Sequence, residues 1–237
     1  LELILADMES VDKRIARVAK MEKQKDKDAM IEEPILLKLK EVLEAEKPAR
    51  AADLSDDEKK VIKGLHLLTI KPMLYVANVS EDEVADPSEN KYVKMVQEYA
   101  ASEGAQVIVV CAKIEEEISE LEDEEKKEFL AELGIAESGL DQLIRAAYNL
   151  LGLATYFTAG VQEVRAWTFI QGMKAPQCAG IIHSDFERGF IRAETVAFDD
   201  LVEYGSKSAA KEAGRVRSEG KEYIVQDGDV MEFLFNV

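Results

Sequence analysis

The chain has 237 residues, and its 48 Asp and Glu against 30 Lys and Arg give a formal net charge of −18. An acidic chain has no overall attraction to nucleic acid, so we expect no DNA partner, and the absence of a long apolar stretch predicts no membrane partner. Cys111 and Cys178 lie in unrelated contexts and suggest no disulfide framework, which favours a cytoplasmic location.

The first part of the chain is predicted to form an antiparallel helical hairpin. Apolar residues recur there at spacings of four and three, which places them on one helix face: Ile4, Met8, Val11, Ile15 and Val18. A polar connector, residues 23–28, leads to a second helix with Pro34 near its start. The buried face of this helix is predicted to carry Ile35, Leu39 and Val42, and Pro48 closes it.

The middle of the chain predicts a strand–helix–strand unit. Ser55 and Glu58 have the spacing of a capping box, so a helix is expected to begin there and run to about Leu68. Apolar runs at 73–77 and 107–110 predict parallel strands joined by a crossover helix over 89–103. An acidic stretch, 115–125, is interpreted as a solvated helix face.

A final helix is predicted to cover this sheet and to stop at Gly152, with an apolar stripe of Leu140, Leu143, Ile144, Ala147 and Leu151. From residue 155 the pattern changes to alternating strands, at 156–158 and 163–169, with frequent glycines. A tight turn at Asp227-Gly228 precedes the last strand. This pattern of short strands, glycines and a tight turn predicts a small mixed α+β module.

Two short motifs follow the predicted parallel strands. Asn78-Val79-Ser80-Glu81 follows the first strand, and Cys111-Ala112-Lys113 follows the second. The carboxyl ends of parallel strands are where open α/β sheets bind ligands. A turn-forming asparagine at a strand end is the alternative interpretation of Asn78. No Gly-x-x-x-x-Gly-Lys-(Ser/Thr) phosphate loop occurs in the sequence.

The order of these parts resembles the Obg-like ATPase family, called YchF in bacteria. Besides the two motifs, the resemblance rests on segments 155–160, 164–168, 189–194 and 225–230. It implies an α/β fold: a partial P-loop GTPase-like parallel sheet with an inserted antiparallel helical hairpin, plus a C-terminal α+β ubiquitin-like (TGS) domain. The expected boundaries are 1–8 and 56–151 for the nucleotide-binding part, 9–55 for the hairpin and 152–237 for the TGS domain.

The resemblance also implies a function. The family hydrolyses a nucleoside triphosphate, ATP in preference to GTP, and associates with the ribosome, so ribosome and RNA are the expected partners. Its phosphate loop and Mg²⁺ ligands are expected upstream of Leu1, in a longer polypeptide, and this chain alone is expected to be inactive. The alternative is a non-catalytic RNA- or ribosome-binding module formed by the hairpin and the TGS domain.

The base-recognition residues implied by the resemblance are Asn78, Val79, Glu81, Cys111, Ala112 and Lys113. The carboxamide of Asn78 can donate to and accept from the N6 and N7 edge of adenine. Glu81 stands where most related GTPases carry aspartate. Its extra methylene moves the carboxylate out of the geometry that binds guanine, which predicts relaxed or reversed base preference.

The resemblance also implies roles for the other residues. Val79 is expected to cover the base, Cys111 and Ala112 to offer backbone groups, and Lys113 to lay its stem along the base or ribose. Cys111 is otherwise interpreted as a small buried hydrophobe.

Basic residues concentrate in two places on this acidic chain. One is a strip in the first helix and connector: Lys13, Arg14, Arg17, Lys20, Lys23, Lys25 and Lys27. The other is the C-terminal module, where a positive face could comprise Arg165, Arg188, Arg192, Lys207, Lys211, Arg215, Arg217 and Lys221. Such faces suit RNA phosphates, and ordinary solvated side chains are the alternative for the C-terminal set.

Overall fold

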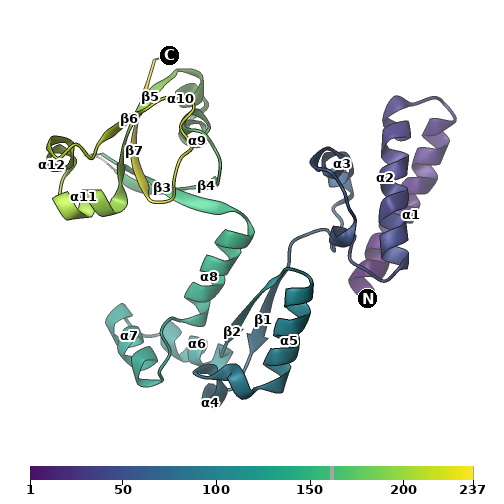
Figure 1. Ribbon diagram of the computed structural model, residues 1–237, viewed down its shortest axis with the longest axis horizontal. Helices are drawn as coiled ribbons and strands as arrows, with labels where there is room; N and C mark the ends of the chain where they lie inside the picture. The colour runs from purple at the N-terminus through teal and green to yellow at the C-terminus, as the bar shows by residue number, and fades with distance from the viewer. Residues whose placement is uncertain (161–162, 237) are drawn as a thin grey trace. The chain divides into compact units, whose positions relative to one another are not determined.

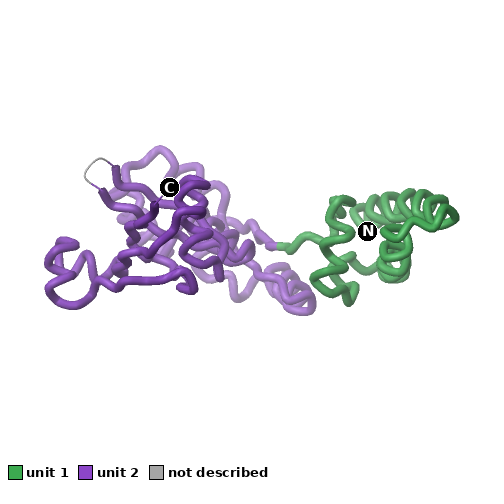
Figure 2. Tube along the Cα trace, turned by 90° about the horizontal axis from the view of Figure 1, so that it is seen from above, with its two compact units in different colours: residues 1–73 green, residues 74–237 purple. Residues whose placement is uncertain are grey.

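The computed structural model describes residues 1–160 and 163–236, and the protein has an α/β fold (Figure 1). Its contacts divide the chain into two compact units, Leu1–Met73 and Leu74–Val237 (Figure 2). The three-part division proposed from the sequence remains a prediction. No helix in the described ranges is both long and apolar enough to cross a membrane.

The first unit is built on the predicted helical hairpin. Helix α1 (Glu2–Glu22) packs along α2 (Lys27–Glu44), and their shared core holds Val11, Val18, Leu36, Leu39 and Leu43, all buried. Val42, which we expected on this seam, is only partly buried, so the seam passes through Leu43 instead.

Helix α2 begins earlier than the position of Pro34 suggested. The carboxylate of Asp26 accepts the backbone N–H groups of Asp28 (2.9 Å) and Ala29 (3.1 Å), which satisfies donors that a helix N-terminus leaves without partners. Pro34 therefore lies inside the helix, and the prediction that it sits near the start was wrong.

The rest of the first unit folds back onto α1 through a buried carboxylate. Asp7 accepts the backbone N–H groups of Leu68 and Thr69, both at 2.7 Å, and the Thr69 hydroxyl at 2.6 Å. The capping box of Ser55 and Glu58 is confirmed at the start of α3 (Asp56–Ile62). The helix ends at Ile62, short of the expected Leu68, because a 3-10 turn, Lys63–Leu65, follows and His66 takes a left-handed conformation (φ 50°).

The second unit opens with the predicted strand–helix–strand arrangement. Strands β1 (Leu74–Asn78) and β2 (Gln106–Val110) pair in parallel, with Asn78 opposite Val110. Short helix α4 (Glu81–Val84), the 3-10 turn Pro87–Glu89 and helix α5 (Lys91–Ser102) make the crossover. Three helices follow: α6 (Ala112–Ser119), α7 (Asp123–Glu132) and α8 (Gly139–Leu150).

Helix α8 does not pack through its predicted apolar stripe. Leu140, Ile144 and Leu151 are 56%, 48% and 59% exposed, whereas Ala146 is buried. The helix instead meets β2 through small residues, since a Cβ at Gly139 would lie 2.7 Å from Val110 Cγ1. Close approach of helix to strand selects glycine and alanine there, and the larger side chains remain on the outer face.

The C-terminal part is a five-stranded mixed sheet in the order β4-β3-β7-β5-β6. Its strands are β3 (Leu153–Ala159), β4 (Val164–Ile170), β5 (Phe190–Ala197), β6 (Arg217–Glu219) and β7 (Asp229–Phe235). The connecting helices are α9 (Ala175–Ile182), α10 (Ser184–Arg188), α11 (Phe198–Tyr204) and α12 (Lys207–Glu212). The core centres on Tyr156 and Phe169, and the Tyr156 hydroxyl donates to the carbonyl of Cys178 at 2.9 Å. The TGS designation of this part remains a prediction.

Candidate nucleotide-base site

The two sequence motifs meet at one edge of the parallel sheet. Because Asn78 lies opposite Val110, the loops that leave the two strands begin side by side. The backbone N–H of Val79 donates to the carbonyl of Val110 at 2.9 Å and extends the pairing by one residue beyond β1. The structure thus brings Asn78, Val79 and Glu81 next to Cys111, Ala112 and Lys113, at the edge where open α/β sheets hold ligands.

Asn78 connects the two loops directly. Its Oδ1 accepts the backbone N–H of Ala112 at 2.9 Å, across 34 positions of sequence. Ala112 is the first residue of α6, so this N–H has no partner within the helix. Among the described residues the Nδ2 amide of Asn78 has no partner. The carboxamide therefore joins the loops with its oxygen and presents its NH₂ group to an acceptor.

Glu81 and Lys113 form a second connection between the loops. Glu81 opens α4, and its Oε2 lies 2.8 Å from Lys113 Nζ. The hydrogen bond and the charge of Glu81 raise the pKa of Lys113. Both side chains are exposed, at 43% for Glu81 and 62% for Lys113, so the pair is accessible to solvent and to a ligand.

Cys111 and Val79 line this edge without polar contacts from their side chains. Cys111 is buried in a cluster with Ile114, Ile118 and Leu130, consistent with a small hydrophobe whose backbone precedes α6. Val79 is half-buried. The predicted roles of these residues at the base remain predictions.

Glu115 is a structural residue of this site that the sequence did not reveal. We interpreted it as part of a solvated acidic face, but its carboxylate accepts the backbone N–H groups of Gly139 (2.6 Å) and Leu140 (3.1 Å). It thereby caps the N-terminus of α8 and fixes α6, which carries Lys113, against that helix. The residues are 24 or more positions apart, so no local pattern could have indicated the contact.

Metal ligands are not gathered in this part of the protein. Across residues 1–160 and 163–236, no group of three or more His, Cys, Asp and Glu side chains is placed to hold an ion. The ligands of Mg²⁺ were expected upstream of Leu1, and that expectation remains a prediction.

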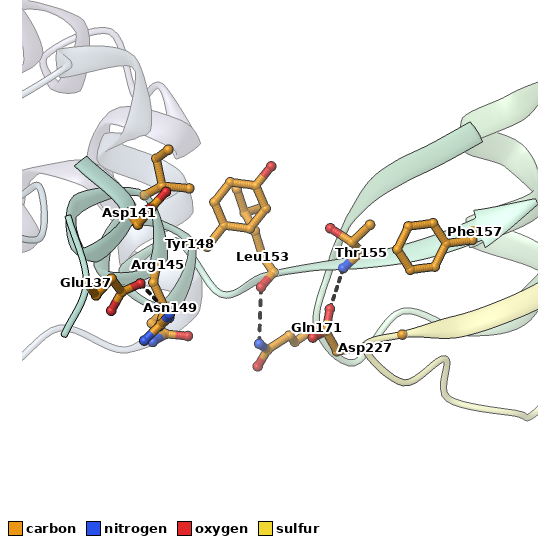
Figure 3. Close-up of a pocket in the computed structure, with 12 residues that line it drawn as sticks. Glu137, Asp141, Arg145, Tyr148, Asn149, Leu153, Thr155, Phe157, Gln171 and Asp227 are labelled. Carbon is orange, nitrogen blue, oxygen red and sulfur yellow. Dashed lines mark hydrogen bonds and ion pairs between the residues drawn. The ribbon is translucent and has the colours of Figure 1, made fainter. Parts of the chain in front are cut away.

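A separate hollow of about 710 Å³ lies between α8 and the C-terminal sheet (Figure 3). Two pairs of its polar groups bind one another: Arg145 pairs with Glu137 at 2.5 Å, and Asp227 accepts the Thr155 N–H at 2.7 Å. None of the six predicted site residues lines it. The sheet edge therefore stays the predicted base site.

The proposed positive face of the C-terminal module is largely neutralised by ion pairs. Arg217 lies 3.0 Å from the buried carboxylate of Asp229, and Lys207 lies 2.9 Å from Glu194. The other pairs are Arg165 with Glu163, Arg188 with Asp185, Arg192 and Lys211 with Glu194, and Arg215 with Asp200. These ion pairs favour the alternative that the basic residues of the C-terminal module are ordinary solvated side chains.

Comparison with known proteins assigns the family. A family model named YchF-GTPase_C, described as a protein of unknown function (DUF933), matches residues 153–236. A Bacillus subtilis (strain 168) protein described as the ribosome-binding ATPase YchF is 72% identical over 237 residues, which are 100% of this chain and 65% of the relative. The chain belongs to the YchF family. An Escherichia coli O157:H7 YchF with the same description is 54% identical and is covered over 64% of its length, against 100% of this chain.

A solved YchF structure agrees with this assignment. The structure of the Schizosaccharomyces pombe YchF GTPase matches 98% of this chain and 63% of its own, with a TM-score of 0.84 and 34% identity. A GTP-binding protein from Pyrococcus horikoshii OT3 shares the fold, with a TM-score of 0.59 at 18% identity over 99% of this chain and 69% of its own. The chain spans about two thirds of the length of the curated YchF relatives it matches. Their descriptions name an ATPase, whereas the yeast protein is called a GTPase.

Proposed function

We propose that this chain supplies the base-binding part of a YchF nucleotide hydrolase that associates with the ribosome in the cytoplasm. The observation that carries the proposal is the hydrogen bond from Ala112 N–H to Asn78 Oδ1. It joins two loops that are distant in sequence into one surface at the carboxyl edge of the sheet. The names of the relatives support hydrolysis and ribosome association.

The site chemistry supports adenine over guanine. The free NH₂ of Asn78 suits an acceptor such as N7 of adenine, and Lys113 offers a charged donor and an aliphatic stem. The Glu81 carboxylate is held by Lys113, and we expect this ion pair to compete with the two donors that guanine presents. ATP is thus the proposed substrate and GTP the weaker one.

Phosphate binding and Mg²⁺ coordination are assigned to residues outside this chain. The sequence holds no phosphate-loop motif, and the described residues hold no metal cluster. We therefore propose that this chain binds the base and ribose, and that residues elsewhere in a longer protein bind the phosphates and the metal.

The test is a titration of the full-length protein with ATP and GTP. Wild type is expected to bind ATP more tightly. Asn78→Ala removes the bond between the loops and should weaken ATP binding roughly tenfold, the effect of losing about 1–1.5 kcal/mol. Asn149→Ala, at an exposed asparagine of α8, is the matched control. Equal ATP affinity in wild type and Asn78→Ala would contradict the proposal.

The second candidate is a non-catalytic RNA- or ribosome-binding module formed by the hairpin and the C-terminal domain. The ion-paired basic residues of the C-terminal domain do not favour it, whereas the hairpin retains basic residues without acidic partners among the described residues. Asn78→Ala distinguishes the two candidate functions. Under the second candidate, the variant should associate with the ribosome almost as well as wild type does. Under the first, it should remove the dependence of that association on ATP.

A further inference from the structure

Five basic residues gather at the end of the helical hairpin. Arg17 and Lys20 lie in the last two turns of α1, Lys23 and Lys25 lie in the turn, and Lys27 begins α2. All five side chains are exposed. We call this set, Arg17, Lys20, Lys23, Lys25 and Lys27, the hairpin tip.

Helix geometry directs the α1 members of the tip away from the core. Residues spaced by four and three share a face, so Arg17 and Lys20 are neighbours there. The buried seam of α1 runs through Val11 and Val18, and at about 100° per residue Arg17 lies on its flank and Lys20 nearly opposite it. Lys25 takes a left-handed conformation (φ 61°) that closes the turn, and it stands exposed between the helices.

The hairpin tip lacks the acidic partners that several other basic residues of the first unit have. Arg14 binds Glu32 at 2.6 Å, Lys13 binds Glu9 at 2.5 Å, and Lys40 binds Asp12 at 2.7 Å. Within residues 1–160 and 163–236, no carboxylate forms an ion pair with any of the five tip residues. On a chain with 48 acidic residues against 30 basic ones, these five neighbouring side chains form a local positive patch.

The acidic residues near the tip are engaged elsewhere. Asp26 accepts the two backbone N–H groups that start α2. Glu22 lies near Glu33 across the hairpin, and burial together with the charge of Glu22 raises the pKa of Glu33. Asp28 is exposed and remains the one acidic group of the turn region, residues 23–28, outside these contacts. The five basic side chains of the tip outnumber these nearby carboxylates, so the tip keeps a net positive charge.

We propose that the hairpin tip docks on the phosphate backbone of RNA. This inference rests on the proposed ribosome association and names the surface that would carry it. Lysine ammonium groups are compact donors that suit phosphates and release counterions when they bind.

The composition of the tip argues against other polyanionic surfaces. Protein interfaces are depleted of lysine and centre on aromatic anchors, and the tip contains no aromatic residue. A lipid surface requires one continuous apolar face. The exposed apolar residues nearby, Met30 and Ile31, are consecutive on α2 and so point about 100° apart. A phosphate backbone needs neither feature.

The test compares two variants with equal charge change in the full chain. The tip variant carries K20Q, K23Q, K25Q and K27Q. The matched control carries K38Q, K40Q, K59Q and K60Q, four lysines of the same unit that each lie within 4 Å of a carboxylate: Glu58, Asp12, Asp56 and Asp57. Binding to a double-stranded RNA hairpin is followed by fluorescence anisotropy over a range of KCl concentrations. Circular dichroism verifies that both variants keep their helices.

The expected result is specific to the tip. Each lost phosphate contact lowers the slope of log K against log salt by about 0.7–0.9, so the tip variant should lose about three units of slope and bind roughly tenfold or more weakly. The control variant should keep most of the slope. Equal slopes for wild type and the tip variant would overturn the proposal. So would tip-dependent binding to polyglutamate or to phosphatidylserine vesicles without binding to RNA.

Sedimentation with purified bacterial ribosomes separates this proposal from the function on which it rests. If the wild type does not sediment with ribosomes, ribosome association fails and the tip proposal fails with it. If wild type and tip variant sediment equally, only the tip proposal fails. Loss of sedimentation in the tip variant, with retention in the control, supports both.

Discussion

The carboxylate of Glu81 and the ammonium group of Lys113 lie 2.8 Å apart and bridge the two loops of the candidate base site. Each residue belongs to a separate short helix, α4 or α6, that starts at the carboxyl edge of the parallel sheet. The pair therefore occupies the place where base selectivity is expected to arise.

Glu81→Asp is predicted to shift nucleotide preference toward GTP. The shorter side chain loses its reach to Lys113 and places the carboxylate where it can accept from N1–H and the 2-amino group of guanine. The ratio of GTP to ATP affinity in the full-length protein should rise about tenfold or more, since paired hydrogen bonds dominate such discrimination. Glu89→Asp, an exposed change in the same crossover, is the control. An unchanged ratio would show that Glu81 does not set selectivity.

Asp7→Ala is predicted to destabilise the first unit strongly. The change leaves the N–H groups of Leu68 and Thr69 and the Thr69 hydroxyl without their acceptor at a site where Asp7 is 2% exposed. Loss of several buried hydrogen bonds should cost roughly 3 kcal/mol in urea unfolding.

Glu9→Ala is the matched control for the Asp7 variant, because it removes only an exposed ion pair with Lys13. Such exposed pairs contribute little to stability, because water and salt screen the two charges. Equal stability of the two variants would mean that the Asp7 contacts do not hold residues 68 and 69 to α1.

Acid is predicted to remove the contribution of Glu58 to stability. Hydrogen bonds from Lys38 and Ser55 lower the pKa of Glu58 from 4.5 to about 2. A carboxyl with a depressed folded-state pKa stabilises the fold above its unfolded pKa, and that effect disappears as pH falls toward the folded pKa. Glu58→Gln should therefore lower the melting temperature at pH 7, and the difference from wild type should close between about pH 4.5 and 2.

The control for this pH dependence is Glu41→Gln, an exposed glutamate of α2. Its difference from wild type should be small throughout the titration. If the melting temperature of Glu58→Gln stays below that of wild type by a constant amount down to pH 2, the prediction fails. The capping box would then stabilise α3 independently of the charge of Glu58.

Gly139→Ala is predicted to disturb the packing of α8 on β2. The added Cβ would lie 2.7 Å and 2.9 Å from two atoms of Val110 and 3.0 Å from Glu115 Oε1. Overpacking of this kind typically costs about 1–3 kcal/mol, and because Glu115 fixes α6, ATP affinity should fall as well. Gly64→Ala has open space and should be nearly neutral. Thermal unfolding and ATP titration of both variants make the comparison.

Local patterns in the sequence were sufficient for most of the elements. Apolar spacing predicted the helical hairpin, the capping box at Ser55 and Glu58 predicted the start of α3, and the apolar runs predicted β1 and β2 as parallel strands. Parallel pairing also places Asn78 and Cys111 near one sheet edge, so the grouping of the six candidate residues followed from sequence order. Their roles at the base remain predictions.

Contacts between distant residues were decided only by the tertiary structure. The bond between Asn78 and Ala112, the cap of α8 by Glu115 and the buried Asp7 join positions that no periodic pattern relates. The outer face of α8 was predicted wrongly for the same reason: periodicity shows that a helix has an apolar stripe, whereas only packing shows whether something covers it. Local backbone preferences and hydrophobic spacing act within a few residues along the chain. The partner of a charge or a hydrogen-bonding group depends on which segments the fold brings together.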